Sequence, residues 1–152
     1  MTTTAPRLNG QIIGQAFYAT RALLDRRLTR EGVTFNQSLV LNVLAQHGGS
    51  WGRQALVERM TGTTKVTAEV AHAAFAELVA AGLVETGPGD RPDLLLTETG
   101  RALQERLAEA VAGIAEQVYA NIPDDELAAA AQVLIRLTEQ ANAALAADEA
   151  AA

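Results

Sequence analysis

The sequence predicts a mainly α-helical protein that carries one small β-hairpin. Apolar residues recur every three or four positions over most of the 152 residues, which is the period of an amphipathic helix. This pattern is interrupted at residues 83–86 and 93–96, two short segments that flank the turn residues Gly87-Pro88-Gly89-Asp90. Glycine and proline at such positions favour a turn and continue neither a helix nor a strand. The two segments are therefore predicted to be the strands of the hairpin.

Two helices are predicted before residue 50. The first covers residues 8–30, where an apolar stripe continues without a proline until Glu31-Gly32 ends it. The second opens at Thr34, because a threonine followed three positions later by Gln37 is the signature of a capping box. Gly48-Gly49 is predicted to close this second helix.

A further pair of helices is predicted between residue 53 and the hairpin. The first of the pair covers residues 53–60 and is expected to break at Thr61-Gly62. The second starts at Thr63 or at Thr67, since either hydroxyl can cap a helix, and it continues to residue 81. Gly82 is expected to end it in the left-handed conformation.

The order of these elements predicts a winged helix-turn-helix. Thr97 can cap a helix directly after the second strand, so the hairpin lies between two helices and follows a pair of helices. In a helix-turn-helix, the second helix of the pair lies in the major groove of DNA. The fold class is therefore mainly α with a small β-hairpin wing.

Two long helices are predicted after the wing. One runs from Thr97 toward Asn121, and the next starts at Pro123-Asp124-Asp125-Glu126, where acidic side chains complement the helix dipole. Residues 146–152 are expected to be a frayed tail. The long apolar faces of these helices and of the first helix exceed what a small winged domain needs for its own core. We therefore expect them to be N- and C-terminal dimerisation helices of a symmetric homodimer.

The composition defines the broad class of the protein. The chain has no cysteine, no charged and apolar leader at its start, and no apolar run as long as a membrane span needs. We expect a soluble cytoplasmic protein with no membrane partner. Its parts are an N-terminal dimerisation helix in residues 1–32, a DNA-binding lobe in residues 33–100 and C-terminal dimerisation helices in residues 101–152, interwoven as one domain.

The net charge of −6 is unevenly distributed. Residues 1–32 carry a net charge of +3, residues 33–100 carry −3, and residues 101–152 carry −6. Because neutralisation of phosphates by lysine and arginine supplies most of the affinity of ordinary DNA binding, a net acidic lobe predicts weak non-specific binding.

Two motifs of the chain resemble the MarR family of bacterial transcription regulators. The wing is Gly82-Leu83-Val84, a turn with Asp90 and Arg91, and then Leu96-Thr97-Glu98-Thr99-Gly100. In the family, the wing has the sequence pattern Gly-Leu-Val, followed by a turn with Asp and Arg and then by Leu-Thr-x-x-Gly. Val33-Thr34-Phe35-Asn36-Gln37 is similar to the family's Leu-Thr-x-x-Gln. The resemblance covers roughly residues 10–140. It implies a homodimer on a pseudo-palindromic operator, modulated by a small phenolic or aromatic acid.

The candidate DNA-binding residues lie in the wing and near the fourth helix. The resemblance places Arg91 at the wing tip, where a long cation can enter a minor groove; this interpretation is favoured over the alternative of a solvated turn charge. A cluster of three threonines and one lysine at the expected start of the fourth helix could bind phosphate, although hydroxyls at such a place are also ordinary helix caps. His72 is the one candidate donor to a base edge in a helix whose other non-core positions are alanine and glutamate. The cluster consists of Thr63, Thr64, Lys65 and Thr67.

The candidate ligand-binding residues follow from the resemblance, which places the effector between the dimerisation helices and the winged lobe. Arg21 with Tyr18 could hold an acidic phenol, although packing is the commoner role for each residue taken alone. The full set is Phe17, Tyr18, Arg21, His47 and Trp51.

No catalytic, metal or cofactor motif is present. The two histidines, His47 and His72, have no metal-ligand spacing, and neither glycine-rich stretch has a phosphate-loop pattern. The sequence therefore predicts a DNA-binding regulator that is not an enzyme and uses no cofactor. The alternative is a winged-helix protein-interaction module in which DNA binding is weak or lost.

Overall fold

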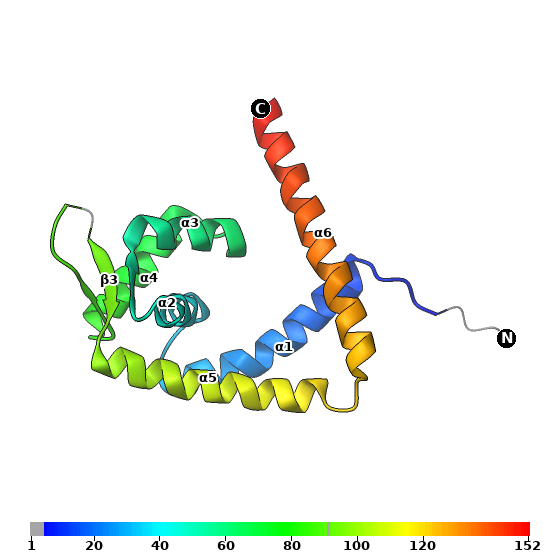
Figure 1. The fold of residues 1–152 in the computed structure, drawn as a ribbon, viewed down its shortest axis with the longest axis horizontal. Helices are drawn as coiled ribbons and strands as arrows, with labels where there is room; N and C mark the ends of the chain where they lie inside the picture. Colours follow the sequence, from blue (N-terminus) through cyan, green and yellow to red (C-terminus); the bar gives the residue numbers. More distant parts are fainter. Residues whose placement is uncertain (1–4, 91) are drawn as a thin grey trace. The chain divides into compact units, whose positions relative to one another are not determined.

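A computed structural model of the chain describes residues 5–90 and 92–152. The chain divides into two compact units, one ending at Ala115 and the other covering Glu116–Ala152. Figure 1 shows the helices and strands of both units.

Helix α1, Gly10–Glu31, confirms the first predicted helix with a start two residues later. Its first turn is capped by Asn9, whose side chain accepts a hydrogen bond of 3.0 Å from the backbone N–H of Ile12. Gly32 ends the helix in the left-handed conformation at φ 71°, as predicted.

Helix α2, Phe35–Gln46, opens on the predicted capping box. The backbone N–H of Gln37 donates to the hydroxyl of Thr34 at 3.2 Å, and the Gln37 side chain accepts from the backbone N–H of Thr34 at 3.0 Å. Both Gly48 and Gly49 have positive φ, so the chain turns there as expected.

Helix α3, Arg53–Thr64, is one turn longer than predicted, because it continues through Thr61-Gly62. A single glycine costs a helix only about 1 kcal/mol. The hydroxyls of Thr61 and Thr64 donate back to carbonyls of the preceding turn, at 3.2 and 2.8 Å. Lys65 ends the helix in the left-handed conformation at φ 57°.

Helix α4, Ala68–Ala80, begins at Thr67, which was one of the two predicted starts. The Thr67 hydroxyl accepts from the backbone N–H of Val70 at 3.3 Å. The expectation that Thr63 and Thr64 also lie at the start of this helix is wrong, because both belong to the last turn of α3.

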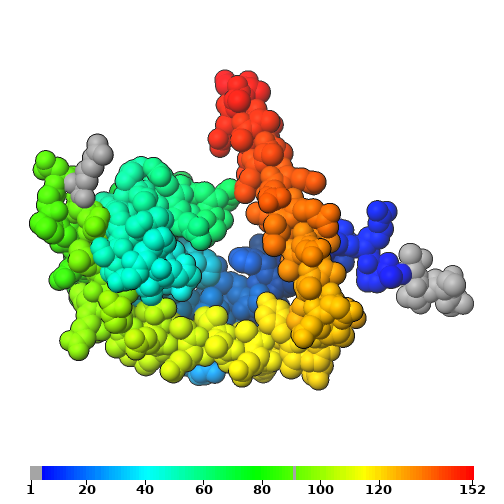
Figure 2. Space-filling model, viewed as in Figure 1, coloured from blue at the N-terminus to red at the C-terminus, as the bar shows by residue number. Residues whose placement is uncertain are grey.

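The wing is a three-stranded antiparallel sheet rather than a hairpin alone. Strands β2, Val84–Thr86, and β3, Asp93–Leu96, form the predicted hairpin, and β1, Ser50–Gly52, pairs with the other edge of β3. In the register, Trp51 lies opposite Leu94. Strand β1 was not predicted, because its three residues, which follow Gly48-Gly49 and directly precede α3, are too few to show an alternation of apolar and polar side chains. β2 and β3 project from the body of the lobe (Figures 1 and 2).

The wing is joined to helix α5, Glu98–Tyr119, by the Leu-Thr-x-x-Gly motif. The Thr97 hydroxyl accepts from the backbone N–H of Gly100 at 3.0 Å and donates to the carbonyl of Gly82 at 2.7 Å. A Cβ atom at Gly100 would overlap the backbone carbonyl of Leu83. The motif therefore ties the start of α5 to the end of α4, and glycine is required because the two backbones touch.

The core of the first unit is apolar and continuous. It is built from α2, α3, α4 and the sheet, with Leu28 of α1 and Leu103 and Leu107 of α5 closing it. No polar or charged residue among the described residues is buried. The positions of α3 and α4 are thus fixed by packing inside one chain.

The second unit is mainly helix α6, Asp124–Ala151, which begins after Pro123 with three acids in its first turn, as predicted. The expected fraying from residue 146 is wrong, since alanine has the highest helix propensity and the helix reaches Ala151. None of the 28 residues of α6, all of which the structure describes, is buried. Throughout the described ranges, no helix is long and apolar enough to cross a membrane.

Candidate nucleic-acid interface and ligand cavity

Helix α4 buries one face and exposes the other. Ala71, Ala74, Phe75 and Leu78 are buried against α2 and α3, while Glu69, His72, Ala76 and Glu77 face outward. The exposed face carries no lysine or arginine of its own. Any cation on this surface must therefore come from a neighbouring element.

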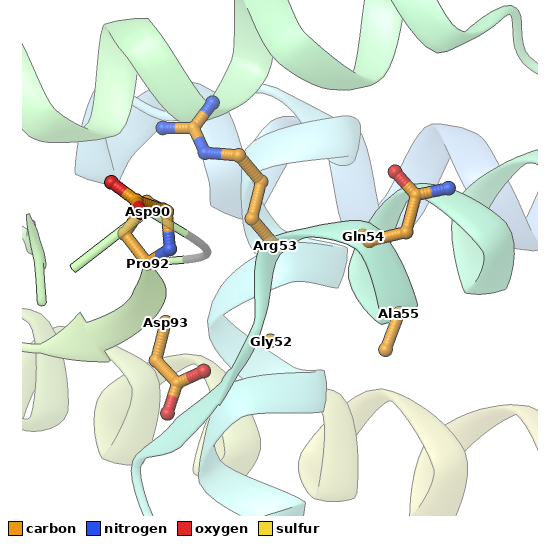
Figure 3. Close-up of a pocket in the computed structure, with 7 residues that line it drawn as sticks. All are labelled: Gly52, Arg53, Gln54, Ala55, Asp90, Pro92 and Asp93. Atoms are coloured by element: carbon orange, nitrogen blue, oxygen red, sulfur yellow. The ribbon is translucent and has the colours of Figure 1, made fainter.

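Arg53, the first residue of α3, is the cation that reaches this surface. Its Nη1 lies 3.5 Å from Nδ1 of His72, and its guanidinium carbon lies 5.5 Å from the centre of the Phe75 ring. The His72 ring meets the same Phe75 ring edge to face, with 5.7 Å between the centroids. Figure 3 shows the Arg53 side chain extending away from Gly52 and Asp93 toward a neighbouring helix.

An open cleft of about 690 Å³ separates the start of α3 from the wing. It is lined by Gly52, Arg53, Gln54 and Ala55 on one side and by Asp90, Pro92 and Asp93 on the other (Figure 3). The backbone N–H of Arg53 donates to the carbonyl of Pro92 at 3.4 Å, which links the two sides. Arg53 thus lines the cleft together with two carboxylates of the wing and also contacts His72 on α4.

The predicted DNA-binding residues do not form one cluster. Thr67 caps α4, whereas Thr63, Thr64 and Lys65 lie at the end of α3, and the Lys65 ammonium donates to the carbonyl of Gly62 at 2.7 Å. His72 is exposed on α4 as expected. Arg91 lies outside the described residues. The DNA-binding roles of all these residues stay predictions.

Arg53 was not among the predicted site residues. It is one of only four cations in residues 33–100, so the charge count could have drawn attention to it. Its contact with α4 could not be foreseen, because the contact joins residues 19 positions apart across a helix-helix packing.

The predicted ligand-binding residues belong to two separate groups. On α1, Phe17 and Tyr18 are 51% and 72% exposed and meet edge to face, while Arg21 pairs with Asp25 at 2.9 Å and lies 3.6 Å over the Phe35 ring. At the end of α2, His47 stacks on Trp51 with 3.9 Å between the ring centroids. Each group is accounted for by its own local contacts.

A cavity of about 340 Å³ lies instead between α1, α2 and α5. Its lining is mostly apolar, with Ser38, Asn42 and Gln104 as the polar groups, and no charged residue of the described chain lines it. None of the five predicted ligand residues lines it either, although the structure describes all five. Arg21 reaches only its wall, through Phe35. The apolar lining residues are Leu24, Leu28, Phe35, Leu39, Leu107, Ala108, Val111 and Ala112.

Within the described residues, no group of three or more histidine, aspartate or glutamate side chains could hold a metal ion. The arrangement at α3, α4 and the wing is that of a winged helix-turn-helix.

Solved structures match this fold over most of the chain, although no protein-family model and no curated protein matches the sequence. The transcriptional regulator PA3341 shares 26% identity, with a TM-score of 0.73, over 86% of this chain and 96% of its own. A MarR-family transcriptional regulator from Rhodococcus sp. RHA1 shares 17% identity, with a TM-score of 0.71, over 85% of this chain and 91% of its own.

BpsR of Bordetella bronchiseptica, whose DNA binding is regulated by 6-hydroxynicotinic acid, shares 17% identity. Its TM-score is 0.72, over 91% of this chain and 98% of its own. The chain therefore has the winged-helix fold of the MarR-family regulators, and the fold that the resemblance implied is confirmed.

Proposed function

We propose that this chain is a MarR-type transcriptional regulator that binds a pseudo-palindromic operator as a homodimer. The observation that carries the proposal is the helix-turn-helix of α3 and α4 beside a projecting wing, in the fold that DNA-binding regulators share. Fold alone does not imply function, so the proposal also rests on two donors of this surface, the exposed His72 and the half-buried Arg53. An enzyme is disfavoured, because the structural neighbours are regulators.

In the proposed complex, α4 enters the major groove and the wing contacts the adjacent minor groove with Arg91. Phosphate contacts would come from Lys65 and from Thr63 and Thr64 at the end of α3. Each copy offers few cations here, so it can neutralise few DNA phosphates. The affinity for DNA should therefore depend only weakly on salt concentration. We expect Arg91→Ala or Lys65→Ala to weaken binding by about 1 to 3 kcal/mol.

The homodimer is proposed from the apolar side chains that each unit leaves exposed. In the first unit these include Leu8, Ile12 and Phe17, and in α6 they are Val133, Leu134, Ile135, Leu137 and Leu145. An apolar stripe along a helix is normally buried against another element, because most of the stability of a helix in a protein comes from the packing of its apolar face. A second copy supplies an identical apolar face, and a twofold dimer brings two recognition helices to successive major grooves.

We propose that an effector binds in the α1–α2–α5 cavity. Its size and apolar walls suit a small aromatic molecule, and Ser38, Asn42 and Gln104 can accept or donate hydrogen bonds. Since no cation among the described residues lines it, a ligand carboxylate would have to face the cavity mouth to remain hydrated. A bound ligand between α5 and α2 would bias the spacing of the two lobes in the dimer.

The function is tested by gel mobility shift with DNA from upstream of the gene for this chain, at low salt, against a shuffled fragment of equal length. Retardation of the upstream fragment at protein concentrations that leave the shuffled one unbound supports the proposal. If no fragment of the genomic surroundings is shifted, the regulator proposal fails. In that case the acidic surface around Glu69 and Glu77 favours the second candidate, a protein-interaction module.

A further inference from the structure

We propose that Arg53 and His72 form one composite base-reading unit, in which Arg53 sets the histidine tautomer and supplies the cation that α4 lacks. This inference rests on the proposed DNA-binding function for its role, but its chemistry is a property of the protein alone. Three contacts carry it: Arg53 to His72, Arg53 to Phe75, and His72 to Phe75.

The tautomer follows from donor chemistry. A guanidinium has only N–H donors and no acceptor, so a hydrogen bond from Arg53 to the His72 nitrogen 3.5 Å away requires a lone pair on that nitrogen. That nitrogen is Nδ1, and neutral His72 then carries its proton on Nε2. The histidine is thereby a donor at Nε2, on the side of the ring opposite to the atom that contacts Arg53.

Phe75 fixes the position of both side chains. The Phe75 side chain is fully buried, its ring and the His72 ring are nearly perpendicular, and the guanidinium of Arg53 lies over it. A guanidinium near an aromatic face and two rings edge to face are each favourable arrangements. The two donors therefore project from a buried platform rather than from two independent flexible side chains.

This pair offers a specific pattern to the major groove. Arginine binds the O6 and N7 atoms of guanine with two parallel hydrogen bonds, and a single N–H donor such as Nε2–H fits the N7 atom of a neighbouring purine. Because Glu69 and Glu77 are the charged residues that α4 itself exposes, Arg53 is the group that makes this helix face attractive to acceptors. We expect a guanine next to a second purine in each half-site.

The first experiment needs no DNA. Nitrogen chemical shifts of the His72 ring, recorded by NMR at a pH where the ring is neutral, should show Nε2 protonated and Nδ1 unprotonated. Arg53→Ala should give a mixture of tautomers, whereas Arg59→Ala, which removes the same charge from an exposed position of α3, should leave the ring unchanged. Protonation at Nδ1 in the wild type, or no effect of Arg53→Ala, overturns the tautomer assignment.

The second experiment uses a DNA fragment that the wild type binds. Arg53→Ala should weaken binding about tenfold or more and remove the preference for guanine. Arg53→Lys should restore affinity but not the preference, because lysine lacks the planar fork. Arg59→Ala should weaken binding less, and equally on all sequences.

The two proposals can fail separately. If Arg53→Ala behaves like Arg59→Ala on a fragment that the wild type binds, the base-reading unit is overturned while the regulator proposal stands. If the wild type binds no fragment, both DNA roles are overturned, and the NMR experiment still decides the tautomer. Thermal melts of each variant, expected to lie close to the wild type, identify any variant that fails to fold.

Discussion

Helices α4 and α6 are both rich in alanine, yet they are held in different ways. Of the 13 residues of α4, four are buried, and Phe75 is completely inaccessible to solvent. Of the 28 residues of α6, every one of which is described, none is buried. The spacing of apolar residues in the sequence thus predicts that both are amphipathic helices. It does not show which of the two apolar faces is buried within its own chain.

This difference has a functional consequence. Because α4 is fixed by the packing of its own unit, its exposed face is presented in a defined orientation even in a single copy. Helix α6 buries none of its residues within its own chain, so its apolar stripe is left to be covered by another molecule. We therefore expect the recognition surface to depend on the core, and α6 to depend on association.

The largest expected effect tests the first half of this comparison. Gly100→Val should destabilise the first unit by several kcal/mol, because the new side chain would be forced into the backbone carbonyl of Leu83. Urea denaturation followed by circular dichroism measures the loss. Gly113→Ala is the control, since a Cβ there meets no atom within 4 Å, and it should stabilise α5 by about 0.5 to 1 kcal/mol. Equal stability of the Gly100 variant and the wild type would contradict the close backbone contact.

The second prediction tests α6. Leu134→Asp combined with Leu137→Asp should convert the dimer to a monomer, because charges would replace two exposed apolar side chains of the proposed interface. Light scattering gives the mass, and the Trp51 fluorescence should still report a folded lobe. Gln140→Asp, which adds a charge to another exposed position of α6, should leave the mass unchanged. A dimer that survives the double substitution would show that α6 is not its interface.

The third prediction concerns the α1–α2–α5 cavity. Aromatic acids and their neutral amides should raise the melting temperature in proportion to the logarithm of concentration, and the amides should be the better ligands because no cation lines the described cavity. Asn42→Leu should reduce the shift, whereas Tyr18→Ser should not, since only Asn42 lines the cavity. A response lost in the Tyr18 variant and kept in the Asn42 variant would move the site back to the residues predicted from sequence.

The smallest effect compares two threonines. Thr67→Ala should cost about 1 kcal/mol, because its hydroxyl caps α4, and a denaturant melt can resolve this. Thr138→Ala in the interior of α6 should be neutral or slightly stabilising, since its hydroxyl only bonds back to Leu134 at 2.8 Å and alanine has the higher helix propensity. An equal loss of unfolding free energy in both variants would mean that the Thr67 cap does not stabilise α4.

What could be predicted from the sequence is what nearby residues determine. The capping box at Thr34 and Gln37, the left-handed Gly82 and the Thr97-to-Gly100 junction are all local, and the structure confirms each of them. The end of α3 was predicted wrongly at Thr61-Gly62, because one glycine costs a helix only about 1 kcal/mol and does not end it by itself.

The candidate sites depend on contacts between distant residues, and these were largely missed. The cavity combines Leu24 with Asn42 and Val111, which share no local pattern, and the Arg53–His72 contact joins two helices. The predicted ligand residues were chosen because the family resemblance implied a site between the dimerisation helices and the winged lobe. Aromatic and cationic side chains are as often used in local pairs, such as His47 on Trp51 and Arg21 with Asp25.

The central claim, a dimeric DNA-binding regulator, is tested most directly by the mass of its complex with DNA. Analytical ultracentrifugation at low salt, with a short duplex that carries the palindrome from upstream of its own gene, should give one duplex bound to two copies of the 16.0 kDa chain. The complex should dissociate only gradually as salt is added, because few phosphates are neutralised. Free duplex at every protein concentration, or a complex that contains a single chain, would contradict the account.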